Sequence, residues 1–193
     1  MNDAISILKS EHRSISAVLH GLKELARLAH DAVARPRFQV LRSMLRYIDE
    51  YPERLHHPKE DEHLFARVLE RDPAARALIE ELQAEHAEGA RLIRELERAL
   101  LFFEEGWPAG AREFRDAVEA YARFNWDHMR KEEQVLLPLA ERVLTAEDWR
   151  AIDRAFAANT DPLGGMRERD YEKLFTRIAN LAPAPVGLGE AWR

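Results

Sequence analysis

The chain has 193 residues, of which 46% are hydrophobic and 33% charged, and this balance is typical of a globular protein with one well-buried core. Its net charge of −6 argues against a general nucleic-acid binder, and no apolar run approaches the roughly 20 residues of a membrane helix. The chain has no cysteine, which excludes disulfides, thiolate metal sites, iron–sulfur clusters and thiol catalysis.

Glycine and proline are few and clustered, and the segments between them are rich in Ala, Leu, Glu and Arg, which favours helices and leaves no convincing strand. Four long helices are predicted, at about residues 3–30, 36–70, 72–103 and 111–144. Short connections between long helices predict an all-α fold, an antiparallel up-down four-helix bundle over residues 1–144. In the second helix, Pro52 and Pro58 predict kinks or breaks.

Residues 145–193 are predicted to form a helical extension and tail packed on the same domain. Thr145 with Asp148 resembles a capping box, which predicts a fifth, shorter helix that ends near Asn159. A second short helix is expected at about residues 167–180, and the Pro/Gly-rich end APAPVGLGEAWR is expected to lie along the surface or to be loose.

Apolar residues recur at alternating intervals of three and four, which is the spacing of a buried helical seam. In three of the four helices this seam contains a histidine. The first seam is Ile5, Leu8, His12, Ile15, Leu19 and Leu22. The seam of the third helix is Leu82, His86, Gly89, Ile93, Leu96, Leu100 and Phe103. The seam of the fourth is Phe114, Val118, Tyr121, Asn125, His128, Glu132, Val135 and Leu139.

One charged motif occurs twice in the chain, as HHPKEDEHLF at residues 56–65 and as HMRKEEQVLL at residues 128–137. The alignment of the two copies pairs His56 with His128 and Glu60 with Glu132. Each half of the chain also has an earlier Glu-His pair, Glu11–His12 and Glu85–His86. The chain is therefore expected to consist of two similar helical hairpins.

Residues four apart on a helix lie one turn above each other, so each His-x-x-x-Glu pair directs an imidazole and a carboxylate to the same point in the core. Two hairpins packed about a pseudo-twofold axis would bring four imidazoles and two carboxylates together. Buried carboxylates without partners are costly, and two divalent cations would remove that cost. Imidazole with carboxylate suits iron, zinc or manganese, and six ligands are too many for one tetrahedral zinc. The predicted metal ligands are His12, His56, Glu60, His86, His128 and Glu132.

Several positions allow more than one interpretation. His57 competes with His56, because His57 and Asp61 also lie four residues apart, but only the pair that begins at His56 aligns with the fourth helix. Gly89 either lets two helices approach closely or leaves room for a ligand. Tyr121 and Asn125 could donate hydrogen bonds near the metals, although core packing is favoured for Tyr121.

These motifs resemble the hemerythrin-like, or HHE cation-binding, domain family, over about residues 3–144. The resemblance implies a non-haem centre of two iron ions, with the four histidines as terminal ligands and the two glutamates as bridges. Oxygen-carrying members have a second histidine on the third helix and an aspartate after the last histidine, where this chain has Ala90 and Glu133. The pattern is closer to the iron–sulfur repair and stress-related members, but repair proteins usually carry a cysteine-bearing region that this sequence lacks.

The expected function is that of a di-iron protein that binds or reacts with O2, NO or peroxide, in sensing or in protection against oxidative or nitrosative stress. The alternatives are an iron-handling or iron–sulfur repair protein and an interaction module with a structural metal site; whether the chain is an enzyme stays open. No signal peptide is recognisable, so the expected location is cytoplasmic. Trp107, Trp149 and Trp192 are candidate contacts for a homodimer.

Overall fold

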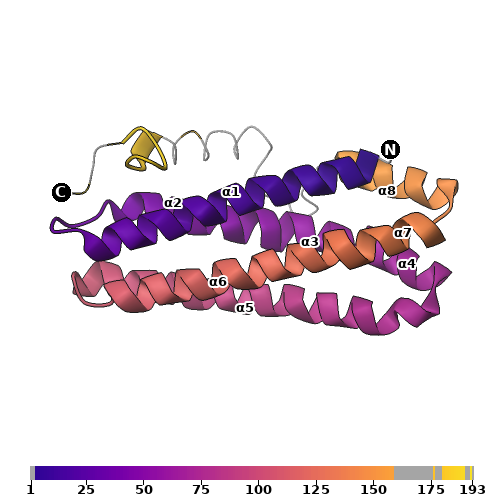
Figure 1. Cartoon of the computed structure of the whole chain (residues 1–193), viewed down its shortest axis with the longest axis horizontal. Helices are drawn as coiled ribbons and strands as arrows, with labels where there is room; N and C mark the ends of the chain where they lie inside the picture. The colour runs from indigo at the N-terminus through magenta and orange to yellow at the C-terminus, as the bar shows by residue number, and fades with distance from the viewer. Residues whose placement is uncertain (1–2, 159–175, 177–179, 190–191, 193) are drawn as a thin grey trace.

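The structure is a computed structural model that describes residues 3–158, 176, 180–189 and 192. Over these residues four long helical segments run alternately up and down, with their connections at alternate ends of the bundle (Figure 1). The first segment is α1 (Asp3–Asp31) and the third is α5 (Arg76–Gly106). The prediction of an all-α antiparallel four-helix bundle is confirmed.

The second segment is helical from Phe38 to Arg71 and contains two wide π-helical stretches. Its parts are α2 (Phe38–Ile48), η1 (Asp49–His56), α3 (His57–Lys59), η2 (Glu60–Phe65) and α4 (Ala66–Arg71). Pro52 lies inside the first π stretch, where its missing N–H and its ring are accommodated by the wider turn. The expected proline break is therefore a local widening of a continuous helix.

The fourth segment also contains a π-helical stretch, and this stretch changes which side chains face the core. It consists of α6 (Ala111–Lys131), η4 (Glu132–Leu136) and α7 (Leu137–Val143). Within η4 the inward positions fall one residue later than the predicted seam, so Leu136 is fully buried while Val135 is 49% exposed. The prediction that Val135 lies in the seam is therefore wrong, because a π turn adds a residue that the regular spacing does not count.

The fifth helix, α8 (Ala146–Ala158), begins at the predicted capping box. The Asp148 N–H donates to the Thr145 hydroxyl at 3.2 Å, and the Thr145 N–H donates to the Asp148 carboxylate at 2.9 Å. Arg71 donates two further hydrogen bonds to the same carboxylate, at 2.8 and 2.9 Å, which tie α8 to the end of α4. The second short helix predicted for residues 167–180 lies largely outside the described residues.

The inner face of α8 is apolar and is covered by the bundle. Trp149, Ile152 and Phe156 are buried in one core cluster with the first residues of α1. Trp149, at 7% exposed, is therefore not the free surface aromatic proposed for a dimer contact. At the other end of the molecule, Ala182 of the tail is fully buried against the bundle.

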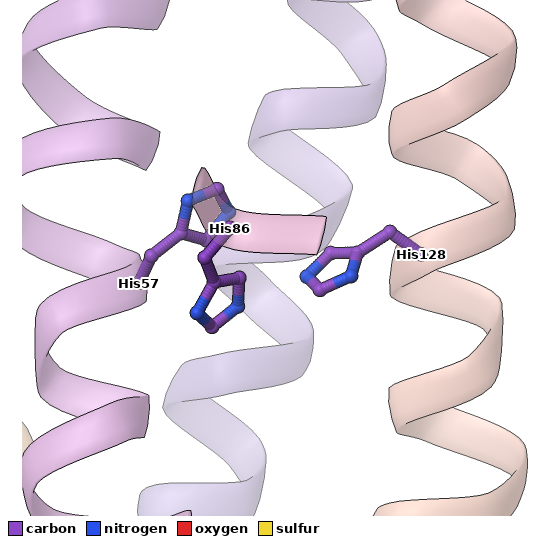
Figure 2. Close-up of side chains that lie close together, drawn as sticks. All are labelled: His57, His86 and His128. Atoms are coloured by element: carbon purple, nitrogen blue, oxygen red, sulfur yellow. The ribbon is translucent and has the colours of Figure 1, made fainter. Parts of the chain in front are cut away.

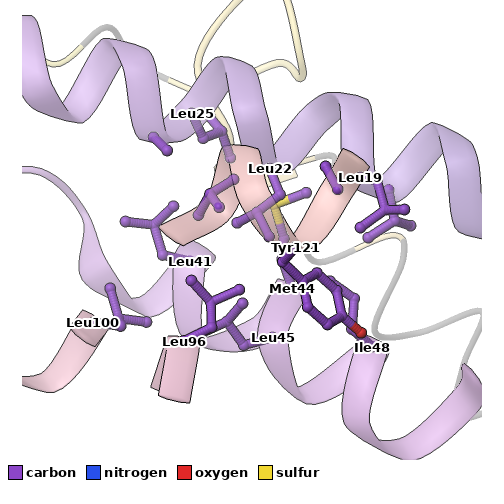
Figure 3. Close-up of a cluster of buried hydrophobic side chains, with 14 of the residues drawn as sticks. Leu19, Leu22, Leu25, Leu41, Met44, Leu45, Ile48, Leu96, Leu100 and Tyr121 are labelled. Carbon is purple, nitrogen blue, oxygen red and sulfur yellow. The ribbon is translucent and has the colours of Figure 1, made fainter. Parts of the chain in front are cut away.

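The described residues form two apolar clusters at opposite ends of the bundle. The larger cluster includes Leu19, Leu22, Leu41, Met44 and Tyr121 (Figure 3). The smaller cluster joins the start of α1 to the end of α4, the start of α5 and α7. The histidines and glutamates of the predicted site lie between the two clusters. Within the part of the chain that the structure describes, no helix has the length and hydropathy needed to cross a membrane.

Candidate metal centre

A layer of buried polar side chains separates the two apolar clusters, and all six predicted ligands lie in it. Each of the six is at most 6% exposed, and both glutamates are fully buried. Together with His57, their possible ligand atoms form two groups, within each of which the atoms lie within 4.8 Å of one another. The first group is His12, His56, Glu60 and Glu132, and the second is His57, His86 and His128 (Figure 2). The structure thus brings both His56 and His57 into the layer, one in each group.

The two carboxylates of the first group also face histidines of the second. Glu132 has one oxygen 3.2 Å from His12 Nε2 and the other 3.2 Å from His128 Nε2. Glu60 has one oxygen 3.9 Å from His12 Nε2 and the other 3.6 Å from His86 Nε2. Each carboxylate therefore faces both groups, which is the arrangement that a bridging ligand requires.

Seven inward-facing atoms of this layer have no hydrogen-bond partner among the described residues. Both oxygens of Glu60 and of Glu132 are without one, as are the Nε2 atoms of His12, His86 and His128. Buried polar atoms left unpaired are strongly destabilising, and buried carboxylates more so. Imidazole nitrogen and carboxylate oxygen together form the donor set of first-row transition metals, so these unpaired atoms fit a pair of cations.

The opposite ring nitrogen of each of these histidines faces a carboxylate. The distances from Nδ1 to the nearest carboxylate oxygen are 2.7 Å for His56 with Glu11, 2.9 Å for His128 with Glu85, 2.9 Å for His12 with Glu133 and 3.2 Å for His86 with Asp61. A carboxylate that accepts from Nδ1–H leaves the lone pair of Nε2 free for a metal and fixes the orientation of the ring. All four rings thus present Nε2 to the centre.

The contacts of the carboxylates behind His56 and His128 are the same in the two hairpins. Lys59 donates to Glu11 at 2.8 Å, and Lys131 donates to Glu85 in the corresponding position. The first residue of each Glu-His pair therefore contacts the histidine of the neighbouring helix in its own hairpin. The sequence shows the duplicated pairs, but the contact between helices is visible only in the folded chain.

Burial and local hydrogen bonds shift the pKa values in this layer. Burial lowers the pKa of His56 to about 3. Burial alone would raise the pKa of Glu11, but the hydrogen bond and charge of His56, together with Lys59, lower it to about 2. Burial and the charge of Glu132 raise the pKa of Glu60 well above its usual value. Near neutral pH, His56 is therefore a neutral ring beside an ionised Glu11, the state in which it can bind a metal.

Glu53 is a further member of the layer that the sequence interpretation missed. Its side chain is 4% exposed, and one carboxylate oxygen accepts a hydrogen bond from the Tyr121 hydroxyl at 3.0 Å. The other oxygen lies 3.3 Å from His57 Nδ1. Burial raises the pKa of Glu53 to about 7. Residues 53, 56, 57 and 60 share one helix face by their spacing, a signal that the prolines of the second helix obscured.

Comparisons with known proteins agree with the geometry of this layer. No curated protein matches the chain significantly. The family model described as the hemerythrin HHE cation-binding domain matches residues 3–140, which includes every member of the polar layer. Both histidine and glutamate clusters lie within the matched residues. The chain belongs to the hemerythrin HHE cation-binding domain family.

Proposed function

We propose that the chain is a non-haem di-iron protein that binds or reacts with a small ligand, O2, NO or peroxide, in sensing or in protection against oxidative or nitrosative stress. The observation that carries the proposal is the layer of inward-facing nitrogen and oxygen atoms without hydrogen-bond partners. Bound iron would supply the electrons for chemistry on such a ligand and a coordination position at which it binds. The protein supplies the ligand shell and excludes bulk water.

The residues that would hold the two ions follow from the two groups. His12 and His56 would bind one ion, His86 and His128 the other, and the carboxylates of Glu60 and Glu132 would bridge them. The carboxylates that face the Nδ1 atoms, those of Glu11, Asp61, Glu85 and Glu133, would orient the imidazoles by accepting from Nδ1–H. The apolar clusters on both sides of the layer keep the centre in a low-dielectric environment.

A surface hollow supports a small ligand and disfavours a large substrate. It has a volume of about 280 Å³ and lies between α1 and the α6–η4 segment, with His12, Trp126, Met129 and Glu133 among its lining residues. Because His12 is also a member of the buried layer, this hollow brings the surface of the bundle close to the candidate centre. The other described residues of the layer are buried, so a bulky substrate has no comparable space there.

The proposal is tested by loading the apo-protein with ferrous iron under anaerobic conditions and then adding O2, NO or peroxide separately. At least one of the three is expected to produce a new visible absorption with a defined ligand-to-protein ratio, because only a redox-active metal gives charge-transfer bands. A zinc-loaded sample serves as the control, since zinc has no redox chemistry and should give no such bands. A spectrum that none of the three ligands changes would contradict the proposal and favour a structural metal.

A further inference from the structure

The two halves of the centre are related by the duplicated motif, but one pair of side chains breaks this relationship. In the alignment of the two His-x-x-x-Glu motifs, His57 lies opposite Met129, and Glu53 lies opposite Asn125. Only the first hairpin therefore contributes a second imidazole and a carboxylate behind it. The duplicated motif therefore does not explain why Glu53 and His57 are present.

The imidazole of His57 is packed as part of the candidate centre. Its ring stacks on that of His86, with centroids 4.2 Å apart and planes 10° apart, and lies 5.5 Å from the His128 ring. Figure 2 shows the three side chains converging from different helices. His57 is 6% exposed, so its ring nitrogens need partners inside the protein.

Glu53 stands behind this ring in the way that the other carboxylates stand behind theirs. Its Oε2 lies 3.3 Å from His57 Nδ1, and neither atom has a hydrogen-bond partner among the described residues, while Oε1 accepts from the Tyr121 hydroxyl. The two nitrogens of an imidazole lie on opposite sides of the ring, so Nε2 of His57 points away from Glu53. In the other four histidines of the layer, a carboxylate likewise faces Nδ1.

Gly89 on α5 provides the space for this carboxylate. A Cβ at position 89 would lie 3.1 Å from Oε1 of Glu53, which is closer than most real Cβ contacts, and 3.4 Å from Oε2. A side chain at this position would therefore push the carboxylate away from His57. The glycine, Glu53 and Tyr121 come from three different helical segments and meet at one point.

We infer that Glu53, held by Tyr121, positions His57 as a fifth histidine ligand, on the same ion as His86 and His128. The inference rests on the proposed function, because it assigns these residues a role toward bound metal. A carboxylate that accepts from Nδ1–H keeps Nε2 deprotonated and aimed at the cation. The ion in this group then has three imidazoles and the ion beside His12 has two, so the two metal positions are inequivalent.

The test compares zinc-loaded wild type with the Glu53→Gln variant, using long-range proton–nitrogen spectra of protein labelled with ¹⁵N at histidine. In the wild type, His57 is expected to show one metal-bound and one protonated nitrogen. In Glu53→Gln the side-chain amide no longer offers a charged acceptor, so the metal-bound signal of His57 is expected to weaken or disappear. The signals of His12 and His56 are expected to stay unchanged. The affinity for one of the two ions should fall by about 10- to 100-fold.

Two further variants separate positioning from a general effect on folding. Gly89→Ala keeps Glu53 but crowds its carboxylate, and should reproduce the change in the His57 signal. Gly21→Ala is the matched control: its Cβ would lie 3.1 Å from the Met44 methyl group, the same close approach at a place outside the centre. This control should leave all histidine signals unchanged.

The outcomes distinguish the inference from the proposed function on which it rests. If Glu53→Gln and Gly89→Ala both keep a metal-bound His57 and the wild-type affinity for both ions, the inference is overturned, but the proposed metal centre is not. If wild type shows metal-bound His12, His56, His86 and His128 but not His57, the inference is overturned in the same way. If wild type shows no metal-bound histidine at all, the proposed function fails with it.

Discussion

Replacing Glu132 with glutamine is expected to lower the amount of bound metal from two ions per chain to one or none. The two oxygens of this carboxylate face different groups, at 3.2 Å from His12 and 3.2 Å from His128, so one substitution removes a ligand from both positions. The amide keeps the volume of the side chain but has no negative charge and only one acceptor oxygen. The measurement is metal content by mass spectrometry after loading and desalting.

The control for this substitution is Glu141→Gln, which changes an exposed glutamate on α7 in the same segment of the bundle. It should bind as much metal as wild type. If Glu132→Gln also retained both ions with unchanged affinity, Glu132 would not be a ligand, and the assignment of the two groups to one paired centre would be wrong.

Metal loading is expected to raise the free energy of unfolding by a large amount. The apo-protein contains two buried carboxylates that have no hydrogen-bond partner among the described residues, and metal binding to the folded state alone stabilises it by about 2.7 kcal/mol per ion when free metal is about 100 times Kd. For a chain of this size, two ions correspond to a rise in Tm of about 10–20 °C. Thermal denaturation with and without a divalent metal measures the effect.

The stability measurement is controlled by melting the Glu132→Gln variant with and without metal, alongside wild type. Without metal it should melt at a lower temperature than apo wild type: burial opposes ionisation of Glu132, but the charge of His128 and the contacts with His12 and His86 lower its pKa well below the usual value, and glutamine loses these interactions. With metal it should gain little. Apo and loaded wild type that melt within about 2 °C of each other would show that the polar layer does not need ions to be stable.

The fold was predictable because its main determinant is a regular seam of apolar side chains. Alternating intervals of three and four place Leu8, His12 and Ile15 on one buried face, and the structure has these residues there. The positions beyond Glu132 were not predictable from the same rule. The π turn that buries Leu136 in place of Val135 depends on how the whole helix packs, and the local sequence does not specify it.

The candidate site was predictable to the extent that it is duplicated. The aligned His-x-x-x-Glu motifs identified His56 and His128, and the structure places both in the polar layer. The same alignment could not identify His57 and Glu53, because the second hairpin has Met129 and Asn125 at the corresponding positions. His57 and Glu53 are recognisable as part of the site only in the folded chain, where they meet residues of two other helical segments.

The outer carboxylates illustrate a second limit. Glu11 and Glu85 precede seam histidines in the sequence, so they read as neighbours of His12 and His86. In the folded chain each instead contacts a histidine more than 40 residues away, at 2.7 and 2.9 Å. Which partner a side chain finds across a helix interface depends on the relative height of the helices, which composition and periodicity do not define.

X-ray absorption at the iron edge of the anaerobically loaded protein tests most directly whether the histidines and glutamates of the polar layer converge on a pair of ions. If the imidazoles and the two shared carboxylates hold a pair of ions, the spectrum will show outer-shell scattering from several imidazole rings and scattering from a second iron atom, at two irons per chain. Iron surrounded by oxygen alone, without imidazole scattering or an iron neighbour, would contradict a paired centre in the polar layer.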